Sequence, residues 1–159
     1  MNLTRTPTPS EDAALAECNL RANAIAKEET AKAGIVAAVM RDGDVIAWGE
    51  NEVHLAHDPT RHAEIVAMSR AAHAQGGSDL KGCVLVTSLQ PCEMCLAAMR
   101  FAGIDRVIFG AGKDAVAGKY FMFPGLDLPD YEKAAKGGFM AIGPHRQDEV
   151  IDLYADAQE

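Results

Sequence analysis

The chain has 159 residues, a length that fits one domain with a sizeable core and leaves little room for two. Its net charge is −8, and Lys and Arg form no cluster, which argues against a nucleic acid substrate. The N-terminal residues lack the apolar core of a secretory signal, and no apolar run could span a bilayer. We therefore expect a cytoplasmic protein without a membrane partner.

Hydrophobic periodicity predicts a single α/β domain over residues 1–159, with residues 1–9 as a flexible tail. In chain order we first expect a helix N-capped by Ser10 and closed by Gly34, then strands at 35–40 and 45–49 and a loop at 50–60. A helix from His62, a strand at 83–88, a helix at 92–102 and a strand at 106–111 follow. The remainder is predicted as mixed loop and short helix at 113–138, a strand at 139–143 and a closing helix at 147–157.

The Asp42-Gly43 pair between the first two strands is a strong hairpin signal. After the hairpin, strands alternate with helices. This order predicts a three-layer fold in which helices cover both faces of a central mixed sheet of about five strands. The helix at 92–102 carries charge only at Glu93 and Arg100 and is apolar all round. We therefore expect one of its faces to meet another subunit in a homodimer.

Two of the four cysteines, Cys92 and Cys95, form a C-x-x-C motif that opens a predicted helix directly after Pro91. The free amides and the dipole of a helix start favour thiolate over thiol. Taken alone, the motif fits a redox dithiol, a structural zinc site and a catalytic zinc site equally well. Cys18 and Cys83 lie in apolar segments, where cysteine behaves as a small hydrophobic residue.

His62 opens a second helix, 30 positions before Cys92 (92 − 62 = 30). If both helix starts meet at one edge of the sheet, His62, Cys92 and Cys95 come together. Three protein ligands leave the fourth zinc position open for water, which is typical of a catalytic site. Glu64 does not share a helix face with His62, so it is free to move protons between the water and a substrate.

The motifs His62-Ala63-Glu64 and Pro91-Cys92-Glu93-Met94-Cys95 resemble the zinc-dependent cytidine and deoxycytidylate deaminase superfamily, whose signature is H-x-E…P-C-x-x-C. The longer segments NEVHLAHDPTRHAEIVAM and TSLQPCEMCLAAM look like the branch that contains guanine deaminases, cytosine deaminases and tRNA adenosine deaminases. The resemblance runs from about residue 43 to residue 112. It implies a cytidine deaminase-like fold.

The resemblance implies one Zn²⁺ per subunit, held by His62, Cys92 and Cys95, and Glu64 as the catalytic proton shuttle. Zinc would activate a water that attacks the ring carbon bearing the amino group, with release of ammonia. It also implies a set of substrate-binding residues: Asn51, Ala63, Thr87, Leu89 and Gln90.

The sequence departs from the family pattern at three places. Arg61 stands where alanine is common, Gln90 replaces an acidic residue, and the segment KYFMFPG lacks the acidic residue that guanine deaminases place there. The resemblance leaves open which further residues complete the site: Asp127, Asp148, Glu149 or Tyr154.

We expect a free nucleobase as substrate, namely guanine, cytosine, isoguanine or a related amino-heterocycle, because a small closed pocket with a few polar groups suffices for it. A tRNA adenosine deaminase is the alternative, although it would benefit from the basic surface that this chain lacks. Two further hypotheses are a C-x-x-C redox protein and a non-catalytic zinc-binding module.

Overall fold

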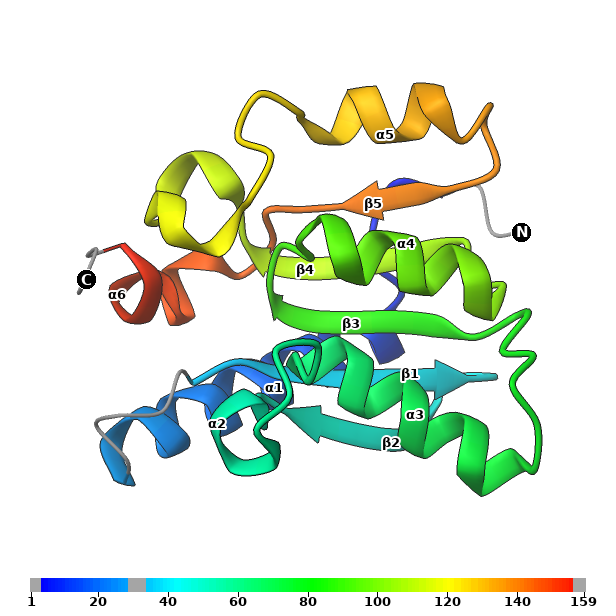
Figure 1. Ribbon diagram of the computed structural model, residues 1–159, viewed down its shortest axis with the longest axis horizontal. Helices are drawn as coiled ribbons and strands as arrows, with labels where there is room; N and C mark the ends of the chain where they lie inside the picture. The colour runs from blue at the N-terminus through cyan, green and yellow to red at the C-terminus, as the bar shows by residue number, and fades with distance from the viewer. Residues whose placement is uncertain (1–3, 29–33, 156–159) are drawn as a thin grey trace.

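The computed structural model describes residues 4–28 and 34–155 (Figure 1). Its strands are β1 (Val36–Arg41), β2 (Asp44–Glu50), β3 (Val84–Leu89), β4 (Arg106–Ala111) and β5 (Met140–Ile142). Its helices are α1 (Pro9–Glu28), α2 (Val53–Ala56), α3 (Ala63–Gln75), α4 (Glu93–Ala102), α5 (Leu128–Ala134) and α6 (Ile151–Tyr154), with 3₁₀ turns η1 (Lys113–Ala115), η2 (Gly118–Tyr120) and η3 (Gln147–Glu149).

The strands form one mixed sheet in the order β2-β1-β3-β4-β5. Strand β1 pairs antiparallel with β2 and β3, while β3, β4 and β5 run parallel. Helix α1 packs on one face, and α3 and α4 lie side by side on the other (Figure 1). The predicted three-layer α/β fold with a five-stranded mixed sheet is confirmed.

The β1–β2 hairpin turns at Asp42-Gly43, as the sequence predicts. Both residues have positive φ, 52° and 84°. This backbone matches the two-residue turn that suits the twist of antiparallel strands. Arg41 and Asp44 pair across the turn, and the register of the two strands shifts between Val39 and Met40, where Val39 pairs with Ala47 and Met40 with Val45.

Helix α1 begins at Pro9, two residues earlier than a helix capped by Ser10 would, and Ser10 is not its cap. The Thr8 hydroxyl accepts a hydrogen bond from the Glu11 amide (3.2 Å), and the Glu11 carboxylate accepts one from the Thr8 amide (2.8 Å). This reciprocal pair is a capping box, with Pro9 at the first helical position. The predicted helix end before Gly34 falls at residues 29–33, outside the described residues.

Other element boundaries differ more from those predicted from the sequence. The short helix α2 lies inside the segment expected to be a loop. The expected closing helix at 147–157 is instead η3 followed by α6, and its last two residues lie outside the described part of the chain. Helix α4 buries Cys95, Leu96 and Met99 on one side and exposes 94% of Phe101 on the other. Within the described ranges, no helix is long and apolar enough to cross a membrane.

Close packing of α3 on β2 places the start of α3 against the sheet. A Cβ atom on Gly49 would lie 2.4 Å from the Ala63 carbonyl oxygen and 2.4 Å from the Ala67 amide nitrogen. Only glycine fits at such a distance, because real Cβ contacts are longer. Gly49 therefore lets the first turn of α3, which follows His62, sit directly on β2.

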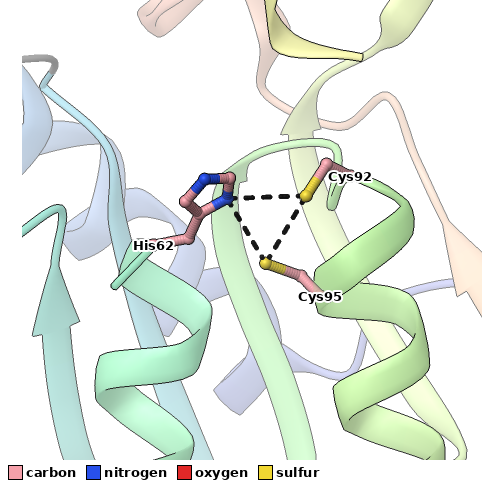
Figure 2. Close-up of side chains that lie close together, drawn as sticks. All are labelled: His62, Cys92 and Cys95. Atoms are coloured by element: carbon pink, nitrogen blue, oxygen red, sulfur yellow. Dashed lines mark hydrogen bonds between the residues drawn. The ribbon is translucent and has the colours of Figure 1, made fainter. Parts of the chain in front are cut away.

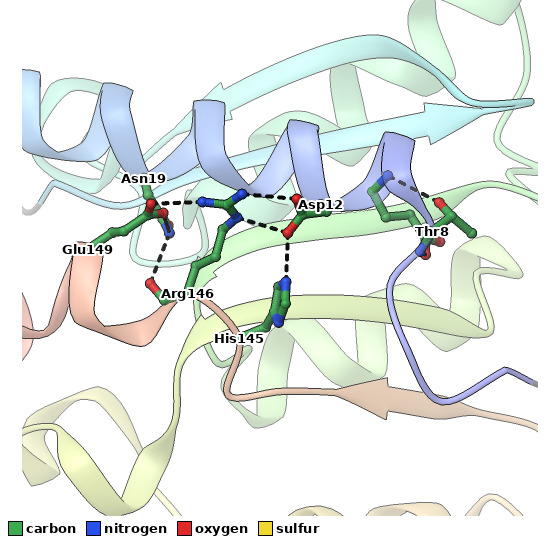
Figure 3. Close-up of polar contacts among 7 residues, drawn as sticks. Thr8, Asp12, Asn19, His145, Arg146 and Glu149 are labelled. Atoms are coloured by element: carbon green, nitrogen blue, oxygen red, sulfur yellow. Dashed lines mark hydrogen bonds and ion pairs between the residues drawn. The ribbon is translucent and has the colours of Figure 1, made fainter.

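The C-terminal segment is tied to α1 on the opposite face of the sheet (Figure 3). Arg146 donates to both oxygens of Asp12, at 2.8 and 2.9 Å, and His145 Nε2 lies 2.7 Å from Asp12 Oδ1. The hydrogen bonds from Arg146 and His145 hold the pKa of Asp12 well below its usual range. Asn19 donates to Glu149 (3.0 Å), which extends this connection along α1.

Candidate metal centre and active site

The starts of α3 and α4 meet beside the end of β3. His62 is the N-cap residue of α3, and Cys92 is the N-cap residue of α4. Cys95 lies in the first turn of α4, so its thiol points back toward Cys92. Figure 2 shows the three side chains converging from the two neighbouring helices. The structure thus brings together the three residues that the sequence predicts as metal ligands.

The donor atoms form a small triangle. His62 Nδ1 lies 3.5 Å from Cys92 Sγ and 3.7 Å from Cys95 Sγ, and the two sulfur atoms are 3.7 Å apart. Tetrahedral zinc, with Zn–S of about 2.3 Å and Zn–N of about 2.0 Å, requires S–S of about 3.8 Å and S–N of about 3.6 Å. The residues therefore fit zinc in both donor type and spacing.

The same contacts shift the protonation of the ligands. The hydrogen bond between Cys92 and Cys95 lowers the pKa of Cys92 to about 4, and His62 contributes in the same direction. The bond to Cys92 in turn raises the pKa of Cys95, as does burial. The bond to Cys92 also raises the pKa of His62. Cys92 is thus a thiolate at neutral pH, the form that a metal ion binds.

Glu64 lies beside this triangle in the first turn of α3. Its Oε1 accepts a hydrogen bond of 2.7 Å from the Thr87 hydroxyl on β3, and its Oε2 accepts one of 3.4 Å from the Cys95 thiol. The side chain is buried, and burial raises its pKa above the ordinary value. A carboxylate in this place can exchange a proton with a molecule bound at the metal.

The predicted substrate-binding residues lie in three segments, which are the turn before α2, the start of α3 and the end of β3. Asn51 precedes α2, and its Oδ1 accepts a hydrogen bond from the Val53 amide (2.9 Å). The Glu52 amide donates to the Arg61 carbonyl (3.0 Å), which joins the Asn51 turn to the residue before His62. The remaining predicted residues are buried at the start of α3 or at the end of β3: Ala63, Thr87, Leu89 and Gln90.

Of the four residues that the sequence left open, three form hydrogen bonds with other residues and Asp148 is exposed. Asp127 accepts a hydrogen bond from Lys113 (2.8 Å). Asp148 is exposed, and Glu149 bonds to Asn19 on the far face of the sheet. The Tyr154 hydroxyl is buried, donates to the Gly34 carbonyl and lies 2.8 Å from the Ser88 hydroxyl.

Sequence reasoning missed two residues, Lys113 and Glu93, that connect the metal-binding segment to later parts of the chain. Lys113 donates its backbone amide to Gln90 Oε1 (2.9 Å), and Glu93 accepts two backbone hydrogen bonds from residues 122 and 123. No local pattern marks either residue, because each contact joins positions more than 20 residues apart.

Site and fold together define a hydrolytic deaminase domain that binds a metal ion. Residues 9–111 match the cytidine and deoxycytidylate deaminase zinc-binding region. The chain therefore belongs to this family, which confirms the resemblance seen in the sequence and the expected zinc cofactor.

Known relatives cover two substrate classes. Guanine deaminase of Bacillus subtilis (strain 168) is 37% identical over 101 residues, which are 61% of this chain and 65% of that protein. A tRNA-specific adenosine deaminase of Aquifex aeolicus (strain VF5) is 32% identical over 108 residues, or 68% of this chain and 72% of that protein.

The similar solved structures also include both a tRNA deaminase and a guanine deaminase. A structure from studies of A-to-I editing by tRNA:A34 deaminases has a TM-score of 0.72 and 26% identity, and covers 87% of this chain and 97% of that chain. The B. subtilis guanine deaminase structure has a TM-score of 0.60 and 31% identity, and the match covers 72% of this chain and 67% of that chain. Family membership thus defines the reaction class and leaves nucleobase and tRNA substrates unresolved.

Proposed function

We propose that the protein is a zinc-dependent aminohydrolase of a free nucleobase or related amino-heterocycle such as guanine, cytosine or isoguanine. The reaction chemistry rests chiefly on one observation, the buried Glu64 carboxylate bonded to both Thr87 and Cys95. The choice of a small substrate rests on the net charge of −8 and the absence of a Lys or Arg cluster in the sequence. The free thiols of Cys92 and Cys95 suit a reducing compartment such as the cytoplasm.

His62, Cys92 and Cys95 would hold zinc, which when bound supplies Lewis-acid activation of water. Glu64 does the proton transfer. Thr87 donates to Oε1, whereas the Cys95 thiol that contacts Oε2 would lose its proton on binding zinc. Oε2 is therefore the oxygen left to carry a proton. Glu64 takes a proton from the attacking water and delivers it to a ring nitrogen. It then transfers the second proton to the departing amine, so that water is consumed and ammonia is released.

Asn51 would bind the ring. Because its Oδ1 is engaged by the Val53 amide, the side chain presents Nδ2 as a donor. The substrate must therefore offer an acceptor, a carbonyl oxygen or ring nitrogen. Ala63, Thr87, Leu89 and Gln90 would form the remaining wall of the pocket at the ends of α3 and β3.

Ammonia release by the zinc-loaded protein tests this proposal with a panel of free bases, nucleosides, a deoxynucleotide and tRNA. We expect turnover of free bases, with one zinc per chain by elemental analysis. Glu64→Gln should lower kcat by about 10²–10⁴-fold and keep the zinc content. Full turnover by Glu64→Gln would refute the mechanism. Turnover of no compound by zinc-loaded wild type would favour the non-catalytic zinc-binding module.

The second candidate is a tRNA adenosine deaminase. It is favoured by the Aquifex aeolicus relative, whose alignment covers more of both chains than the guanine deaminase alignment does. Turnover confined to tRNA in the same assay would establish it and would overturn the argument from net charge.

We further propose that α4 mediates a homodimer. Three apolar residues of this helix lie outside the hydrophobic core at helical spacing: Met94, Ala97 and Phe101. Phe101 is 94% exposed, although a side chain of this size gains most from burial. Sedimentation should give a dimer at micromolar concentration, and Phe101→Ser should shift it toward monomer. A monomeric wild type would overturn this proposal.

A further inference from the structure

The segment between β2 and α3 carries Asn51 and is held by little apolar packing. None of residues 51–62 is buried, and Leu55 on α2 is 75% exposed. Helix α2 has only four residues, too few for a helix to be stable without contacts to the rest of the chain. Polar contacts must therefore fix the position of Asn51.

Glu52 links this segment to α3 through charged contacts. It is the N-cap residue of α2, yet its side chain makes no capping hydrogen bond. Its Oε2 instead accepts a hydrogen bond of 2.8 Å from Arg70 Nη2 on α3, and its Oε1 lies 3.6 Å from Arg61 Nη2. The Glu52 side chain is 15% exposed, so water and salt screen these charges less than they would at a fully exposed site.

Arg70 connects three parts of the fold. Besides its bond to Glu52, it donates from Nη1 to the Trp48 carbonyl on β2 (3.0 Å). Helix α3, on which Arg70 lies, is itself fixed by its buried face against β2. The same helix carries Glu64 in its first turn. Through Arg70, the segment with Asn51 is therefore attached to the helix that holds the proton carrier.

Arg61 is one of the departures from the family pattern, in which alanine is common at this position. Its backbone carbonyl accepts a hydrogen bond from the Glu52 amide (3.0 Å), and its guanidinium group forms the ion pair with the Glu52 carboxylate. Alanine would keep the first contact and lose the second. Since Arg61 directly precedes His62, the second contact attaches the Asn51 segment to the metal centre as well.

We propose that Glu52 is a positioning residue that fixes Asn51 relative to the metal centre through its two arginine partners. This inference rests on the proposed function, since it assigns the contacts that hold the proposed ring-binding residue. Glu52 acts through Asn51 and not on the substrate itself. A displaced Asn51 donor weakens binding of the ring, whereas the metal ligands and Glu64 keep their own contacts.

Glu52→Ala and Arg70→Met together test the positioning role. Both remove the 2.8 Å hydrogen bond, but the first raises the local charge and the second lowers it. Positioning predicts the same result for both: amide hydrogen exchange in residues 51–60 and KM for the preferred substrate should each rise about fivefold, with a smaller change in kcat. Opposite changes in KM would show that only the local charge matters and would overturn the positioning role.

Arg5→Met is the matched control for Arg70→Met. Arg5 forms an ion pair of 3.2 Å with Glu132, and its side chain is 63% exposed, against 53% for Arg70. Its loss should leave KM and exchange in residues 51–60 unchanged. Arg70→Lys keeps the charge and a donor for Glu52, so it should restore part of the protection and of KM.

Zinc content separates positioning from general damage. Glu52→Ala should keep one zinc per chain, because the ligand triangle does not depend on Glu52. Loss of zinc would show that the metal centre itself had moved, and would overturn a role confined to Asn51. Arg61→Ala should raise exchange in residues 51–60 less than Arg70→Met does, since its ion pair is longer.

Failure of the proposed function gives a different result. In that case zinc-loaded wild type turns over no compound of the panel, and the exchange measurements still decide whether Glu52 holds the segment. Unchanged exchange in both Glu52→Ala and Arg70→Met would overturn the attachment whatever the substrate is. Faster exchange with unchanged KM in an active enzyme would overturn the positioning of Asn51.

Discussion

Replacement of Thr87 by valine removes one hydrogen bond from the site with almost no change in volume. Thr87 is fully buried, and its hydroxyl donates to Glu64 Oε1 at 2.7 Å. A hydrogen bond to a charged group contributes about 1.5–3 kcal/mol, and its loss leaves a buried acceptor without a donor. For a chain of this size, about 2 kcal/mol lowers Tm by about 4–8 °C.

Thr87→Val should also lower the catalytic rate. Without Thr87, the Glu64 carboxylate loses the contact that fixes Oε1, and we expect kcat to drop by about 10–100-fold, a part of what a positioned proton-transfer group contributes. The zinc content should stay the same, because Thr87 does not touch the ligand triangle. Differential scanning calorimetry, elemental analysis and steady-state kinetics measure the three effects.

Thr60→Val is the control for this experiment. Its hydroxyl donates to Asp58 at 2.6 Å on the exposed surface, and its loss should change stability by less than about 0.5 kcal/mol. An unchanged kcat in Thr87→Val, with the expected fall in Tm, would show that Glu64 does not depend on Thr87. An unchanged Tm would contradict the hydrogen bond itself.

Three further predictions concern stability. Glu11→Gln leaves the buried Arg106 without its ion-pair partner and should lower the free energy of unfolding by about 3–5 kcal/mol in urea titration. Burial raises the pKa of Glu11, but the hydrogen bonds from Arg106 and Thr8 and the charge of Arg106 together outweigh it and set the pKa below 4.5. The stabilisation by Glu11 is therefore present above pH 4.5 and is lost as the pH falls through the folded-state pKa. Gly49→Ala should separate α3 from β2, with a loss of more than about 2 kcal/mol. Zinc at a thousandfold excess over Kd should stabilise the apo-protein by about 4 kcal/mol, measured as a rise in Tm.

Local patterns in the sequence were enough to predict the five strands, the helices α1, α3 and α4, and the three residues of the candidate metal centre. They did not predict the short helix α2 or the division of the closing helix into η3 and α6. The Asp42-Gly43 turn, the C-x-x-C helix start and the alternation of strands and helices depend on residues close together in the chain, so each is readable without the fold. The spacing of His62 and Cys92 predicted their meeting, because a β-α-β crossover returns the chain to the same sheet edge. The cap of α1 was misplaced because Ser10 and Thr8 are both good cap residues, and only the bond to Glu11 distinguishes them.

Contacts between distant segments were decided by the tertiary structure alone. Thr87 meets Glu64 across 23 positions, and Arg106 meets Glu11 across 95. Neither pairing follows from residue type, since a threonine in a strand or an acid in a first helical turn has many equivalent uses. The same holds for Lys113, an ordinary loop lysine in the sequence that the fold places under three acceptors of one segment. Residue types and their spacing along the chain thus predicted the ligands and the reaction class. The contact that orients Glu64 depends on packing, because packing alone sets distances between residues far apart in the chain.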